Sequence, residues 1–321
     1  MTMHNINDAQ ANLAFVQSNA HTINSTVYET RFPDLDFGRL VYVDSSMPEF
    51  TPGIVTFIST TYGKADWYSS GAKDIQKADV GRDKNETKVH MAAVGYGYDL
   101  EEVGQAALMG IALDAGKARA ARRAYTEFMW NVTLTGDTAK GLKGLINQAG
   151  VSAATAPADG TSSATTWFNG AGVQTKTSAQ IVRDFNGVIT GIYTGSQTVE
   201  MADTVLLPHT TLAQLAATPR SDNTDETLLA FILRTNIYTQ MTGQQLTIRG
   251  VLGLDAAGAG STKRMVAYAN REDVTKLHLP MPHKFLPVWQ DGPTSFEIPG
   301  IFRTGGVEVM RPGAFRYLDG I

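Results

Sequence analysis

Two strand-like segments with a charged stretch between them dominate the first third of the chain. Residues 54–62 are β-branched and aromatic, which is typical of a strand. Apolar side chains recur at every second position within 88–98, which predicts a second strand. Residues 63–87 are charged and turn-rich. We therefore expect a long hairpin with a solvated tip, and because an isolated ribbon is marginal in water, it needs a partner surface.

The longest helical pattern follows directly. Asp99 and Glu102 form a capping-box pattern, and no proline interrupts residues 100–131. Seven apolar side chains share one stripe at helical spacing: Val103, Ala107, Ile111, Ala118, Ala121, Tyr125 and Phe128. The spacing predicts one helix over 100–131, about 45 Å long at roughly 1.5 Å per residue.

The rest of the chain mixes short helices, strands and glycine-rich turns. Residues 1–40 form a polar segment without sustained periodicity, which we expect to lie along a neighbouring subunit. We expect a turn at 136–145 and an irregular loop at 149–172. Helices are predicted at 177–193, 209–217 and 227–238, and strands at 205–208, 246–252, 264–268 and, after a proline-rich stretch, 305–312.

Charge changes this picture in one respect. Charged residues supply 18% of the 321 positions, where about 25% is usual. The deficit indicates surface that other subunits cover, with a monomer rich in uncharged polar residues as the alternative. The net charge of −4 argues against a dedicated nucleic-acid binder. Arg119, Arg122 and Arg123 nevertheless gather opposite the apolar stripe, either as a solvated face or one paired with neighbouring acids, or as a face toward DNA phosphates.

Candidate chemistry is sparse. The chain has no cysteine, which excludes disulfides, thiolate metal sites and cysteine nucleophiles. His278 and His283 lack the spacing of a zinc-hydrolase motif, and Gly136-x4-Gly141 lacks the Lys-Ser/Thr of a phosphate loop. We therefore predict no catalytic, cofactor or metal site, and rank a soluble enzyme or binding module last. No secretory signal or apolar run of about 20 residues is present, so no membrane partner is expected.

The order of the predicted elements, together with four local segments, resembles a known protein family. The four segments are Tyr96 to Glu102, Asn131 to Asn147, Val205 to Leu215 and Gly305 to Pro312. The chain resembles the Hong Kong 97-type major capsid proteins of tailed bacteriophages, a fold shared with encapsulins. The resemblance implies an α+β fold with four parts: an N-terminal arm at 1–40, an extended β-hairpin loop at 41–98, a peripheral domain at 99–175 and 300–321 with spine helix 100–131, and an axial domain at 176–299.

The resemblance also implies a function. The chain would self-assemble through hexamers and pentamers into an icosahedral virion shell around double-stranded DNA, after synthesis in the cytoplasm of the bacterial host. Some relatives begin with a removable scaffold segment. We expect none here, so any scaffold would be a separate protein or absent, and portal or decoration proteins are further candidate partners. An encapsulin-like compartment for protein cargo is the alternative.

Overall fold

The computed structural model describes residues 33, 35–67, 77–109, 113–221 and 223–321. The chain divides into two compact units, Met1–Asp34 and Leu35–Ile321. Most of the predicted arm, and its expected contact with a neighbour, lies outside the described residues. Leu40 and Val41, at the end of that predicted arm, are buried in a hydrophobic core of the second unit.

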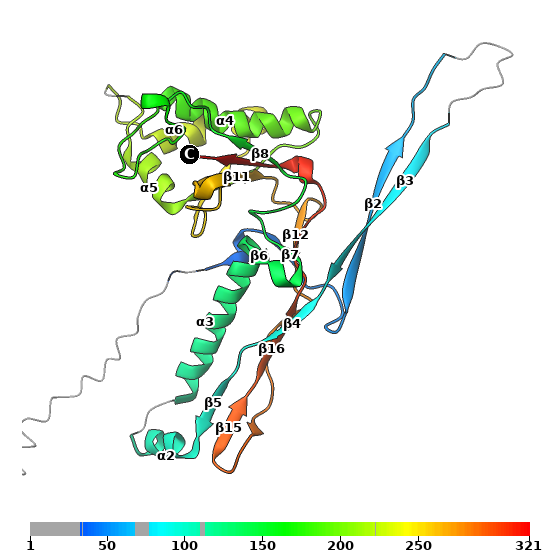
Figure 1. Ribbon diagram of the computed structural model, residues 1–321, viewed down its shortest axis with the longest axis vertical. Coiled ribbons are helices and arrows are strands. Elements are labelled where there is room, and N and C mark those ends of the chain that lie inside the picture. The colour runs from blue at the N-terminus through cyan, green and yellow to red at the C-terminus, as the bar shows by residue number, and fades with distance from the viewer. Residues whose placement is uncertain (1–32, 34, 68–76, 110–112, 222) are drawn as a thin grey trace, which may run out of the picture. The chain divides into compact units, whose positions relative to one another are not determined.

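A long antiparallel hairpin, which we call the hairpin from here on, is the most extended element of the second unit (Figure 1). It consists of β2 (Gly53–Tyr62) and β3 (Asp79–Lys88), with all ten residue pairs in register. The first strand is confirmed. Strand structure within 88–98 is confirmed by β4 (His90–Ala93) and β5 (Tyr96–Asp99), but the predicted pairing of this segment with the first strand is wrong. The partner of β2 is β3, which is exposed on both faces and therefore shows no apolar alternation.

The predicted single helix over 100–131 is wrong, because the structure has two helices there. They are α2 (Leu100–Met109) and α3 (Leu113–Leu134). Glycine lowers helix propensity by about 1 kcal/mol relative to alanine, and Gly104, Gly110 and Gly116 all fall in this stretch. In α3 the stripe predicted to be apolar is only partly buried, since Ala121 is inside and Phe128 is exposed.

A five-stranded sheet forms the second half of the unit. Its order is β10 (Thr247–Val251), β9 (Thr204–Pro208), β11 (Arg264–Tyr268), β18 (Phe315–Asp319) and β8 (Ser152–Thr155). The predicted strands β9, β10 and β11 are confirmed. The expected irregular loop at 149–172 instead contributes β8, which pairs in parallel with β18. Pattern analysis also missed β18, so this sheet takes two strands from outside residues 176–299.

Four helices accompany this sheet: α4 (Ser178–Gly195), α5 (His209–Ala217), α6 (Leu228–Thr235) and α7 (Ile237–Thr242). The first two confirm the predictions, and Thr177 and Gln180 form a capping box at the start of α4. The predicted helix over 227–238 is two helices, because Asn236 ends α6 and its side chain accepts a hydrogen bond from the backbone N–H of Thr239 in α7.

Short strands form the remaining sheets. One has the order β1 (Tyr42–Asp44), β12 (Thr275–His278) and β17 (Gly306–Val309), and another β13 (Met281–Phe285), β16 (Gly300–Thr304) and β4. A third is β14 (Trp289–Gln290), β15 (Ser295–Ile298) and β5, and β6 (Gly136–Asp137) pairs with β7 (Leu142–Lys143) at the predicted turn. Short 3-10 helices lie at Phe37–Arg39, Thr138–Lys140, Thr161–Ser163, Ala259–Ser261 and Pro312–Ala314.

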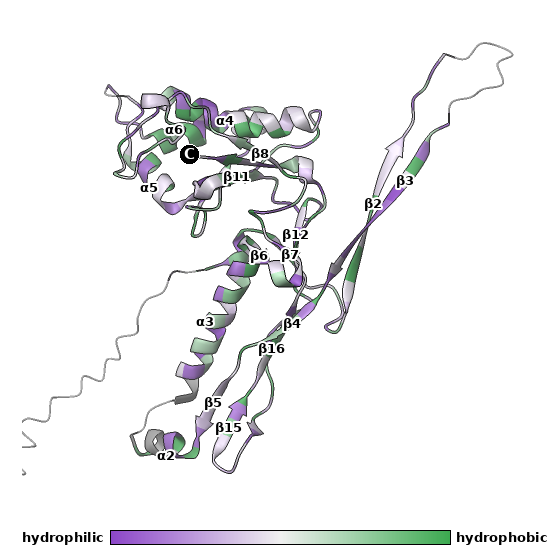
Figure 2. Ribbon diagram, in the orientation of Figure 1, coloured by the Kyte–Doolittle hydropathy of each residue, from purple (hydrophilic) through white to green (hydrophobic). Residues whose placement is uncertain are grey.

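Two hydrophobic clusters hold the second unit together. The first surrounds Met129, Leu145 and Phe302, and the second surrounds Trp167 and Phe185 under α4. Figure 2 shows apolar residues on α4 and α6, with mixed colouring along the hairpin. No helix within the described ranges is long and apolar enough to cross a membrane. The α+β class is confirmed by this architecture.

Candidate functional site: the hairpin and its anchor

One buried carboxylate fastens both strands of the hairpin to the rest of the second unit. Glu308 lies on β17 and is 5% exposed. Its Oε2 accepts a hydrogen bond from the hydroxyl of Thr56 on β2 at 3.0 Å, and its Oε1 accepts one from the amide of Asn85 on β3 at 2.6 Å. Because Thr56 and Asn85 are directly paired across the ribbon, the carboxylate binds both strands at the same cross-strand residue pair.

A buried histidine completes this anchor. The Nε2–H of His278 donates a hydrogen bond to Oε2 of Glu308, and the two atoms lie 2.8 Å apart. Its Nδ1 lies 3.9 Å from Asp44 Oδ2, which is too long for a hydrogen bond. Asp44 accepts hydrogen bonds from the hydroxyl and the backbone N–H of Ser46. We call Glu308, Thr56, Asn85 and His278 the hairpin anchor.

The pKa of Glu308 reflects two opposed influences. Burial disfavours the charged carboxylate and by itself would raise the pKa. Hydrogen bonds from His278, Thr56 and Asn85 favour the charged form and together hold the pKa of Glu308 below its ordinary value of 4.5. The anchor carboxylate is therefore ionised at neutral pH, which makes its hydrogen bonds charge-assisted.

Beyond the anchor the hairpin presents two different faces. Residues directly opposite each other in an antiparallel ribbon share a face, and the faces alternate along each strand. One face, which we call the basic face, combines exposed apolar side chains with cations. It carries Val55, Phe57, Val80, Arg82, Lys84, Glu86 and Lys88. Phe57 is 70% exposed and Val80 is 52% exposed.

The opposite face is acidic toward the tip. It begins with the anchor residues Thr56 and Asn85 and continues with Ile58, Asp83 and Asp79. Tyr62, 61% exposed, also lies on this face and covers Gly81 on the facing strand. Large apolar side chains thus stand in solvent on both faces, which marks the ribbon as a contact surface.

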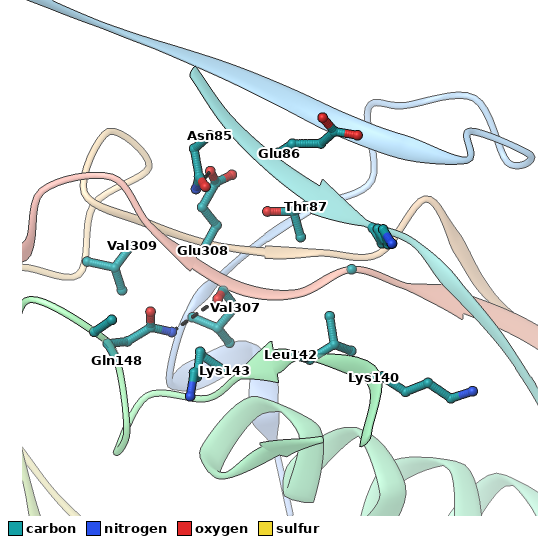
Figure 3. A pocket seen from close by; sticks show the side chains of 14 residues that line it. Asn85, Glu86, Thr87, Lys140, Leu142, Lys143, Gln148, Val307, Glu308 and Val309 are labelled. Carbon is teal, nitrogen blue, oxygen red and sulfur yellow. Dashed lines mark hydrogen bonds between the residues drawn. The ribbon is translucent and has the colours of Figure 1, made fainter. Parts of the chain in front are cut away.

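A cavity of about 530 Å³ lies beside the anchor. Figure 3 shows Asn85 and Glu308 above it and Leu142, Lys143 and Gln148 below. Gln148 donates a hydrogen bond from its amide to the carbonyl of Val307 at 3.1 Å. The cavity lining carries both signs of charge, from Glu86 and Glu308 and from Lys88, Lys140 and Lys143.

The three arginines singled out by the sequence all lie exposed on α3. The guanidinium of Arg122 lies 5.9 Å from the ring centroid of Phe285 on β13. Their proposed contact with DNA is not tested by these positions and stays a prediction.

The two candidate histidines separate in the structure. His278 is buried in the anchor, whereas the ring of His283 stacks on Tyr125 with centroids 5.0 Å apart. No group of three potential metal ligands occurs in the part of the chain that the structure describes. His278 hydrogen-bonds to Glu308, and Nε2 of His283 lies 3.1 Å from the carbonyl oxygen of Val94.

Sequence reasoning missed the anchor. Glu308 did carry a signal, because it is the single charge between Val307 and Val309 in an otherwise apolar strand. A charge in such a strand requires partners, but Thr56 and Asn85 lie more than 200 positions away and nothing in the sequence identifies them.

Taken together, these features define a class of protein. An exposed ribbon with its own carboxylate anchor suits a structural subunit that contacts other subunits. The family model described as major capsid protein matches residues 63–321, so this chain belongs to the major capsid protein family. It is a structural capsid subunit and not an enzyme, as the sequence predicted.

Solved structures agree on the fold. The capsid of Myoviridae phage XM1 matches with a TM-score of 0.77 at 17% identity, over 95% of this chain and 98% of that one. The Microbacterium phage Oxtober96 structure matches with a TM-score of 0.61 at 12% identity, over 98% of this chain and 99% of that one. The capsid of a native GTA particle matches with a TM-score of 0.62 at 11% identity, over 95% of this chain and 98% of that one.

At these identities the likeness shows the fold alone, and it confirms the predicted Hong Kong 97-type architecture. A search of curated protein sequences finds no significant match. The encapsulin-like alternative gains no stronger support from these comparisons.

Proposed function

We propose that this capsid subunit assembles through hexamers and pentamers into a closed icosahedral virion shell around double-stranded DNA, and that the hairpin joins each subunit to the next. The observation that carries the proposal is the exposed ribbon. Six consecutive β2 residues from Phe57 to Tyr62 are exposed, so the ribbon has no core of its own beyond the anchor. Two-stranded ribbons need a supporting surface, and a neighbouring subunit supplies it.

Each part of the chain takes the role that the family resemblance implies. Residues 1–40 act as the arm, and the hairpin is the extended loop. The peripheral domain contains α3 as its spine, and the axial domain is built on the five-stranded sheet. We assign β8 and β18 to the axial domain, because they hydrogen-bond into its sheet. Scaffold, portal and decoration proteins are separate partners, and synthesis takes place in the host cytoplasm.

The decisive experiment shortens the hairpin above its anchor. Replacing residues 57–84 with Asn-Gly joins Thr56 to Asn85 through a tight turn and leaves the anchor intact. We expect a folded subunit that forms no particles, because the body keeps its two cores while the contact surface is gone. Electron microscopy and analytical ultracentrifugation measure the outcome. Normal particles from this variant would refute the proposed role of the hairpin.

A second experiment addresses packaged DNA. Replacing Arg119, Arg122 and Arg123 together with glutamate removes three cations from one exposed helix surface. If this surface faces DNA, particles of the variant retain DNA less well at low salt, and their DNA loss depends less steeply on salt, because fewer phosphates are neutralised. Nuclease sensitivity of filled particles across a salt series measures this. Unchanged retention would assign the three arginines to a solvated surface instead.

A further inference from the structure

The imidazole of His278 lies between two carboxylates that come from different strands. His278 is 2% exposed, and its strand, β12, is the middle strand between β1 and β17. Asp44 on β1 is its direct partner in the strand pairing, and Glu308 on β17 is hydrogen-bonded to its Nε2. The ring therefore lies where β1, β17 and the base of the hairpin come together.

Only one of the two ring nitrogens is satisfied. Nε2–H donates to Glu308, whereas Nδ1 is buried and has no hydrogen-bond partner in the part of the chain that the structure describes. Oδ2 of Asp44 lies 3.9 Å from Nδ1, about 1 Å beyond the usual hydrogen-bond distance. In the neutral ring Nδ1 is an acceptor, and a carboxylate cannot satisfy it. The protonated ring has an N–H at both nitrogens and can donate to both carboxylates.

The charges around the ring favour the protonated form. Asp44 faces it from β1 and Glu308 from β17, and the hairpin groups that contact the anchor are uncharged. Lys276 is the neighbouring cation on β12, and its Nζ lies 3.8 Å from Oδ2 of Asp44 and 3.0 Å from Oε1 of Glu272. Three carboxylates thus surround one lysine. Burial disfavours a charge on the ring, but the two adjacent anions oppose that cost.

Both facing carboxylates stay ionised in the range where histidine titrates. Burial by itself would raise the pKa of Asp44, but hydrogen bonds from Ser46 and the charge of Lys276 hold it below its ordinary value of 3.8. The pKa of Glu308 likewise lies below 4.5. Histidine is the side chain that ordinarily changes charge between about pH 5 and 8. Of Asp44, His278 and Glu308, the imidazole alone therefore gains or loses a proton in this range.

We propose that His278 is a proton-dependent clamp at the base of the hairpin. In the protonated form, Nδ1–H donates to Asp44 while Nε2–H donates to Glu308, so the ring joins β1 to the carboxylate that holds both hairpin strands. In the neutral form the bond to Asp44 is absent. The clamp is complete in mild acid and is lost as pH rises and the ring gives up its proton. It is a property of the single subunit and goes beyond the proposed shell function.

Hydrogen–deuterium exchange of full-length, dissociated subunits tests the clamp, because local opening of a segment exposes its amides to exchange. Peptides from β2 and β3 are compared at about pH 5.5 and pH 8, on either side of the ordinary histidine titration, after correction for the intrinsic effect of pH on exchange. Amides beside the anchor should open at least about fivefold less in acid, since a charge-assisted hydrogen bond is roughly twice as strong as a neutral one. Equal opening at both pH values would overturn the proposal.

Two substitutions separate the clamp from a general effect of pH. In Asp44→Asn the side-chain oxygen can still accept from Ser46, while the new amide N–H can donate to Nδ1 of the neutral ring. The firmer hold in acid should therefore vanish or reverse. His278→Gln keeps a donor for Glu308 but does not titrate, so its hairpin should open equally at both pH values. An unchanged preference for acid in Asp44→Asn would disprove the clamp, whether or not His278→Gln folds.

The matched control is His209→Gln. His209 is an exposed histidine at the start of α5, outside the anchor, and its loss should leave the pH dependence of the hairpin as in the native chain. If His209→Gln abolished that dependence, the clamp assignment would be wrong. Because dissociated subunits are measured, the result does not depend on assembly. A failed clamp leaves the shell function standing, and a chain that forms no particles still shows whether the clamp exists.

Discussion

At the scale of single residues, the hairpin depends on Glu308. Its carboxylate is the common acceptor for Thr56, Asn85 and His278, which lie on three different strands. A buried hydrogen bond to a charged group contributes about 1.5–3 kcal/mol, and removing one partner leaves the others unsatisfied. One side chain therefore determines how firmly both strands of the ribbon are fastened.

Glu308→Gln should lower the free energy of unfolding by about 1–3 kcal/mol at pH 7, because a neutral amide accepts from its three donors more weakly. The loss should shrink in acid. The pKa of Glu308 lies below its ordinary value of 4.5 in the folded state. Its stabilisation is therefore fully present above pH 4.5 and is lost as pH falls through the lower, folded-state pKa. Urea unfolding of both proteins between pH 3 and 7 measures this.

The matched control is Glu86→Gln, on the exposed basic face, where the carboxylate pairs with Lys84 at 3.2 Å. Exposed ion pairs contribute little, so this change should alter stability by less than about 0.5 kcal/mol. A loss at position 86 as large as that at position 308 would show that the anchor has no special role.

At the scale of elements, backbone conformation explains where pattern analysis succeeded and failed. It located α4, α5, β2 and β9, whose apolar positions follow helical or strand periodicity. It failed at β3, where an exposed strand carries no periodic signal. It also failed at β8, a strand of Ser, Ala and Thr whose conformation is imposed by pairing with β18.

Glycines inside helices allow a prediction at this scale. Gly187 is exposed in the middle of α4, and a Cβ there would meet no atom within 4 Å. Gly187→Ala should raise the free energy of unfolding by about 0.5–1 kcal/mol, because alanine loses less backbone entropy on folding. Thermal unfolding monitored by circular dichroism checks it.

Gly144 provides the contrast. A Cβ there would lie 2.3 Å from the carbonyl oxygen of Leu134, so Gly144→Ala must displace the backbone at the end of α3. We expect this variant to be destabilised. A Gly144→Ala protein as stable as the native chain would contradict the close packing of this turn against α3.

At the scale of the whole molecule, stability and assembly are linked. Binding that favours the folded subunit adds to its apparent stability by mass action. The low charge content and the exposed apolar side chains of the hairpin both indicate that much of the subunit surface becomes buried on assembly. The isolated subunit should accordingly be the less stable form.

We expect particles of the native chain to unfold several degrees above dissociated subunits, since about 1 kcal/mol shifts the melting temperature of a domain this large by roughly 2–4 °C. Calorimetry of particles, and of native subunits dissociated by mild denaturant and then dialysed, measures the difference. The variant lacking residues 57–84 should melt at one temperature at every concentration, because it cannot assemble. Identical melting of particles and subunits would contradict the linkage.

The sequence by itself determined the fold class, the main buried elements, the resemblance to phage capsid proteins and the absence of a recognisable catalytic motif. These follow from local periodicity and composition, which any single stretch of chain carries. Only the tertiary structure decided the hairpin anchor and the true partner of β2. The anchor depends on residues far apart in the sequence, such as Thr56 and Glu308. Only folding brings such residues into contact, so no local sequence pattern predicts the contact.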